Sequence, residues 1–273
     1  MQAANVSAKD AMTLRQRTGL GIMDCKSALA ETNGDMKAAE ALLRERMKGK
    51  MDTRTDRAAG EGCIAIAIEP KGAKASIFEL RAETDFTARN EKFRAMANDI
   101  ARMALAAPAG AVNASDAMKA RIDDVRITTG ENISLARGEV LAAAAAPAFA
   151  TYLHHDGKLG VLLQFDGPMP ADLGTGICQH IAAHVPTPQA IDEAGMAHET
   201  VAAYQQAATE EAKQSGKPAE IAAKIAQGKM RKFFEENTLL GQKYVKDDKK
   251  SVKELLPAGV RITRFLRYQV GGT

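Results

Sequence analysis

Residues 63–82 read CIAIAIEPKGAKASIFELRA, and this stretch decides the fold class. Apolar residues alternate with a period of two on both sides of Pro70-Lys71-Gly72, which is typical of two strands joined by a turn. A helix is expected next, over about 90–107, because apolar residues recur there at helical spacing: Phe93, Met96, Ile100 and Met103. A second helix is expected over about 115–127.

The later part of the chain repeats this order. Residues 149–154 and 159–165 are strand-like and joined by Asp156-Gly157, and a helix is expected over 171–184. A last strand over 260–270 should complete a second sheet, with four residues on one face: Ile262, Leu266, Tyr268 and Val270. The pattern predicts an α+β fold built from two related subdomains with antiparallel sheets.

Residues 7–50 are helical and interrupted twice, at Gly19-Leu20-Gly21 and at Asn33-Gly34. Asp24 and Asp35 stand where an N-cap would satisfy free backbone amides. Three short helices in so few residues predict a compact module, similar in layout to ubiquitin-associated domains. Such modules usually bind a partner with one face.

Residues 192–236 are rich in Ala, Gln, Glu and Lys, and Ser215-Gly216-Lys217-Pro218 stands at their middle. Glycine is suited to the end of one helix and proline to the start of the next, so two antiparallel helices are expected, with too few apolar residues for a core of their own. The predicted organisation is a three-helix module at 1–50, a linker at 51–62, one subdomain at 63–135, a second at 136–191 and 237–273, and an inserted hairpin at 192–236.

Composition excludes several functional classes. The 273 residues carry a net charge of only +3, whereas a nucleic-acid-binding protein usually shows a dense basic stripe. The three cysteines form no Cys-x-x-Cys pair, which indicates a reducing compartment without disulfides or a thiolate zinc site. Because no long apolar segment stands at the N-terminus, we expect a cytoplasmic protein without a membrane partner.

No catalytic or cofactor motif is complete. His180 and His184 have the spacing of two metal ligands, but Ile181 stands where a zinc hydrolase needs a glutamate. None of the Gly-Lys pairs fits a phosphate-binding loop, and the Gly-x-Gly pairs are incomplete dinucleotide fingerprints. We therefore expect no metal, no cofactor, no bound nucleotide and no catalytic residue.

The segment from Glu83 to Asn90 joins a strand to a helix and allows two interpretations. Thr84 and Asp85 are ordinary helix-start residues, and Phe86 would pack against Phe93 in the core. Alternatively, Phe86 is an exposed apolar plug beside the charge of Asp85, suited to a crevice in a partner.

Three separate stretches resemble bacterial translation elongation factor Ts. Residues 14–29, LRQRTGLGIMDCKSAL, and the following Asn33-Gly34-Asp35 match its first signature. Thr84-Asp85-Phe86 with Ala88-Arg89-Asn90 resembles the second. Ser215-Gly216-Lys217-Pro218, Leu240-Gly241-Gln242 and Tyr244-Val245 follow in the family's order, so the resemblance covers roughly residues 7–270.

This resemblance implies a factor that exchanges guanine nucleotide on elongation factor Tu and is not an enzyme. By position, Thr84, Asp85, Phe86 and Thr87 would disturb the partner's magnesium site, with Phe86 wedged between two of its helices. Arg15, Met23 and Lys26 would hold the nucleotide domain, whereas His154 and Val245 would face the third domain. Thr87 departs from the family, which usually has Val there.

Two other classes stay open at this point. An RNA-binding accessory protein would use the basic residues of 44–57, although 4% aromatic residues leave little for base stacking. An adaptor would need only the three-helix module, which leaves the hairpin and the Thr84 segment without a role.

Overall fold

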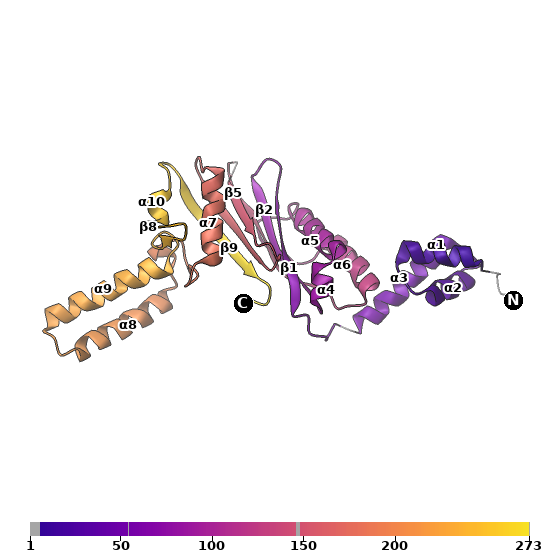
Figure 1. The fold of residues 1–273 in the computed structure, drawn as a ribbon, viewed down its shortest axis with the longest axis horizontal. Helices are drawn as coiled ribbons and strands as arrows, with labels where there is room; N and C mark the ends of the chain where they lie inside the picture. The colour runs from indigo at the N-terminus through magenta and orange to yellow at the C-terminus, as the bar shows by residue number, and fades with distance from the viewer. Residues whose placement is uncertain (1–5, 54, 146–147, 273) are drawn as a thin grey trace.

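Two antiparallel sheets lie at the centre of the molecule in the computed structural model, which describes residues 6–53, 55–145 and 148–272 (Figure 1). The first sheet has the order β1-β2-β4-β3, formed by Glu61–Ile68, Lys74–Ala82, Ser134–Ala142 and Gly110–Ala111. The second has the order β5-β6-β9, formed by Phe149–Leu153, Leu159–Asp166 and Arg261–Gln269. The predicted α+β class with antiparallel sheets is confirmed.

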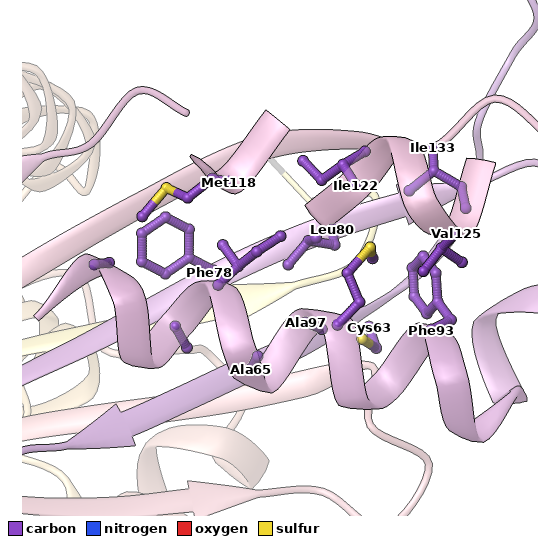
Figure 2. Close-up of a cluster of buried hydrophobic side chains, with 14 of the residues drawn as sticks. Cys63, Ala65, Phe78, Leu80, Phe93, Ala97, Met118, Ile122, Val125 and Ile133 are labelled. Atoms are coloured by element: carbon purple, nitrogen blue, oxygen red, sulfur yellow. The ribbon is translucent and has the colours of Figure 1, made fainter. Parts of the chain in front are cut away.

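Three buried clusters arrange these sheets in layers. Helices α5 (Glu91–Ala104) and α6 (Asp116–Thr129) cover the outer face of the first sheet, and Figure 2 shows side chains of β1, β2 and both helices in this cluster. Helix α7 (Ala171–Ala183) packs on the second sheet. The third cluster joins the two sheets and includes Ile64, Ile77, Phe149 and Leu162. The order is therefore helix, sheet, sheet, helix.

The N-terminal module consists of α1 (Ala8–Thr18), α2 (Ile22–Glu31) and α3 (Met36–Asp52) around its own small core. Asp35 caps α3 as predicted, since its carboxylate accepts the amides of Lys37 and Ala38 at 2.9 and 3.0 Å. The predicted cap by Asp24 is wrong. Gly21 is the N-cap of α2, and Asp24 lies inside the first turn, where its charge still favours the helix.

Helix α3 continues through Asp52, into the first residues of the expected linker. Its last turn docks on α6: Met51 is buried, and its carbonyl accepts a hydrogen bond from Arg126 at 3.0 Å. Ion pairs of Arg44 with Asp124 and of Lys48 with Asp123 join the same two helices. The module is therefore tied to the first sheet's helical layer.

Two further sequence expectations do not fit the strands. The subdomain boundary expected after residue 135 falls inside β4, which pairs with β2 and extends the first sheet to Ala142.

In β9, Ile262 does not share a face with Leu266 and Tyr268. The register shifts along β9, from Gln164 opposite Arg264 to Phe165 opposite Ile262. Because of this register shift, Ile262 faces the α7 side of the sheet, while Leu266 packs between the two sheets.

Helices α8 (His198–Gln214) and α9 (Ala219–Asn237) form the expected antiparallel hairpin, which projects from the sheets at the end opposite the three-helix module (Figure 1). Gly216 has φ 67° and Pro218 is the N-cap of α9, in the roles that the sequence indicated. Four short elements beside the hairpin are not predicted by the sequence. They are the 3-10 turn Glu193–Gly195 before it, and β7 (Lys243–Tyr244), β8 (Asp247–Ser251) and α10 (Val252–Leu255) after it.

Shortening this hairpin should leave a cooperatively folded protein. Replacing residues 206–228 by a Gly/Ser linker removes mainly small buried residues and keeps the stack of Tyr204 on Phe233, whose ring centroids are 4.1 Å apart. We expect the free energy of unfolding to fall by less than about 1 kcal/mol, which shifts the thermal midpoint of a chain of this size by only about 2–4 °C. Circular dichroism would show less helix but one transition; disappearance of that transition would place the hairpin in the core.

Candidate protein-binding site

Helix α4 (Asp85–Arg89) is a five-residue helix between β2 and α5. A helix so short is unstable alone, so its surroundings must hold it. The Thr84 hydroxyl accepts the amide of Thr87 at 3.3 Å, and Asn90 starts α5 by accepting the amide of Lys92 at 2.8 Å. Thr87 and Ala88 are the buried residues of this helix and lie on its inner side. The inner side of α4 is thus fixed on the first sheet.

Phe86 points away from the core, with 83% of its surface exposed. The alternative in which it packs against Phe93 is wrong, because Phe93 is fully buried in the first core and Phe86 lies outside it. Burying a phenylalanine is worth about 1.5–3 kcal/mol, a stabilisation that the free chain does not obtain from this side chain. An isolated, anchored aromatic is the kind of residue that a partner covers.

The neighbours of Phe86 differ in accessibility. The Asp85 carboxylate lies beside it, 3.4 Å from the guanidinium of Arg89 one turn later, and both side chains are exposed to solvent. Thr87 is only 7% exposed, so the structure places it among the residues that support α4 and not beside Phe86.

The other predicted contact residues lie in two different parts of the molecule. Arg15 on α1 and Met23 and Lys26 on α2 are all exposed, Met23 by 72%. Neither basic side chain forms an ion pair within the described ranges. His154 ends the β5 side of a hairpin and bonds the Tyr152 hydroxyl at 2.9 Å. Val245 is 48% exposed in the turn between β7 and β8.

A buried hydrogen-bond network supports the Val245 turn. The Val245 amide donates to Nδ1 of His180 at 3.2 Å, so Nε2 carries the ring proton and donates to Gln242 at 3.0 Å. The Gln242 amide group donates in turn to the carbonyls of Pro186 and Glu236, at 2.9 and 2.7 Å. Burial lowers the pKa of His180 to about 4, so the ring is neutral and structural at pH 7.

This histidine predicts a loss of stability in mild acid. The unfolded chain binds a proton at His180 below about pH 6.5, whereas the folded chain does so only near pH 4, so stability falls as pH drops through this window. We expect a cost of about 2 kcal/mol between pH 7 and pH 5. Urea unfolding at both pH values measures it. His180→Gln should reduce the stability difference between the two pH values, whereas His155→Gln, at an exposed histidine, should not. An equal loss of stability between pH 7 and pH 5 in all three proteins would contradict the role assigned to His180.

Other chemistry has little support in the described residues. They contain no group of three or more metal-ligating side chains, and no helix among them is long and apolar enough to cross a bilayer. Burial raises the pKa of the Cys63 and Cys178 thiols to about 12, which makes both unreactive at neutral pH.

The RNA-binding alternative also loses support. Four basic residues of 44–57 are already engaged in ion pairs with acidic residues of this chain: Arg44, Arg46, Lys48 and Arg57.

Comparison with known proteins gives one consistent result. Residues 83–272 match the family described as elongation factor TS. Elongation factor Ts of Thioalkalivibrio sulfidiphilus is 39% identical, covering 97% of this chain and 92% of that protein. Elongation factor Ts of Methylococcus capsulatus is 40% identical, covering 94% and 89%, and that of Nitratiruptor is 37% identical, covering 97% and 93%. These similarities extend over nearly the whole chain.

Proposed function

The chain belongs to the elongation factor Ts family, as its sequence signatures indicated, and we propose that it binds elongation factor Tu and promotes release of GDP so that GTP can rebind. The observation that carries the proposal is Phe86, exposed by 83% on a helix that is anchored on its other side. Exchange makes and breaks no covalent bond, so binding surfaces suffice.

In this proposal, three regions of the chain contact the partner, and each has a different role. Arg15, Met23 and Lys26 hold the nucleotide domain of the partner, and His154 and Val245 hold its third domain. The elongated arrangement supports this division, because the three-helix module and the β7-β8 turn lie far apart along the molecule (Figure 1). The α4 helix lies between them and acts where the nucleotide is bound.

The chemistry at α4 follows from the role of magnesium. A bound Mg²⁺ neutralises phosphate charge and holds the nucleotide, so displacing its protein ligands weakens GDP binding. Phe86 supplies the apolar wedge that separates two helices of the partner. Asp85 brings a carboxylate to the same place, and Thr84 and Thr87 keep the wedge in position from below.

Reciprocity gives the proposal its test. If this chain loosens GDP, GDP must loosen this chain by the same factor. Gel filtration with nucleotide-depleted elongation factor Tu should show a stable complex that millimolar GDP or GTP dissociates. A complex indifferent to either nucleotide, or no complex at all, would refute the proposal; retention of RNA instead would revive the RNA-binding alternative.

A further inference from the structure

Glu131 lies against the start of α4 although 47 residues separate it from Thr84 in the chain. Helix α6 ends at Thr129, and its C-cap Gly130 has φ 72°, the left-handed conformation by which the chain leaves a helix. One carboxylate oxygen of Glu131 accepts the Thr84 amide at 3.2 Å, and the other accepts the Thr84 hydroxyl at 2.6 Å. Both donors of Thr84 therefore point at one carboxylate.

This contact determines how Thr84 caps the helix. A hydroxyl has one hydrogen, and a carboxylate can only accept, so the hydrogen is directed at Glu131. The lone pairs of the Thr84 oxygen are then free to accept the amide of Thr87 at 3.3 Å. Glu131 thus orients the group that closes the first turn of α4.

Asn132 fixes the position of Glu131. Its backbone amide donates to the Glu83 carboxylate at 2.7 Å, while the Thr84 amide donates to Glu131. The two segments, 83–84 and 131–132, are therefore joined by reciprocal hydrogen bonds. The Asn132 side chain donates to the carbonyls of Thr55 and Arg57, at 3.0 and 2.8 Å. The carboxylate of Glu131 is consequently held between α6, the segment after α3, and α4.

We propose that Glu131 is a positioning residue for Phe86: it holds α4 at the angle at which the wedge enters the partner, without touching partner or nucleotide. The inference rests on the proposed function. Glu131→Gln keeps the size of the side chain but places a donor where Thr84 needs an acceptor. We expect the maximal rate of GDP release to fall about fivefold to tenfold, the factor that loss of a cap bond gives.

The test measures release of a fluorescent GDP analogue from elongation factor Tu over a range of concentrations of this chain. Glu131→Gln should lower the rate at saturation and change the half-saturating concentration less than about threefold. Thr84→Ala should also lower the rate at saturation, and the double variant should be no slower than Thr84→Ala alone, because Glu131 acts through Thr84. Asp116→Asn, on an exposed carboxylate in the first turn of α6, is the matched control.

An unchanged maximal rate, an effect on half-saturation only, or additive effects in the double variant would each overturn the inference. A readout without the partner separates it from the proposed function. Hydrogen exchange of peptides covering residues 83–92 in the free chain should rise in Glu131→Gln and not in Asp116→Asn. If the unmodified chain fails to release GDP, the proposed function fails, whereas unchanged hydrogen exchange overturns the role of Glu131 in either case.

Discussion

Changing Phe86 to Ala is expected to slow GDP release at saturating factor by about 30-fold or more while the free chain stays as stable as before. The side chain is 83% exposed, so its removal leaves no cavity in the free protein. In the complex it would be covered on all sides, and truncating an aromatic at the centre of an interface costs about 2 kcal/mol or more.

The matched control is Phe93→Ala, seven residues later. Phe93 is fully buried, and its truncation should destabilise the free chain by about 3–5 kcal/mol. Asp85→Ala should slow exchange less than Phe86→Ala does, since it removes the charge and keeps the wedge. A large drop in the thermal midpoint of Phe86→Ala, with exchange intact below the transition, would show that the role assigned to Phe86 is wrong.

The second large effect is expected at Glu79, between the two sheets. Its carboxylate is 1% exposed and pairs with Arg137 at 2.7 Å and Arg81 at 2.5 Å. It also accepts the amide of Gly271 at 3.0 Å, and the guanidinium of Arg137 lies 4.4 Å from the ring centroid of Tyr268. One carboxylate of β2 therefore connects β4 of its own sheet to the segment that follows β9.

Glu79→Ala should cost about 3–5 kcal/mol in urea unfolding, because it leaves two partly buried guanidinium groups without their counter-charge. Glu210→Ala is the control: this carboxylate pairs with Lys213 on the surface of α8, and such pairs contribute below about 1 kcal/mol. Equal stability of both variants would show that the Glu79 cluster does not hold the sheets together.

The sequence predicted those elements whose pattern is local. Period-two alternation found β1 and β2, and helical spacing found α5. The sequence does not predict strand β4, which carries Gly138 in its interior, where glycine normally weakens a strand. The need for glycine at this position comes from tertiary packing, since a Cβ at Gly138 would lie 2.0 Å from the ring of Phe78. No local pattern carries that information.

The candidate site divides in the same way. The Thr84 segment was found by its resemblance and by its helix-start residues, but local sequence left Phe86 equally suited to core and surface. Its exposure depends on how α4 lies on the sheet. Glu131 had no signal at all, since its contact with Thr84 joins residues far apart in the chain.

The most direct test of the proposed exchange activity is the release of a fluorescent GDP analogue from elongation factor Tu, followed by stopped flow with excess unlabelled nucleotide. The release rate should rise with the concentration of this chain and level off as the complex saturates. If the chain acts on the magnesium site as proposed, chelating Mg²⁺ should reduce the increase in GDP release rate that the chain causes, because that site is then already empty. A rate equal to spontaneous release at every concentration of the chain would contradict the proposed function.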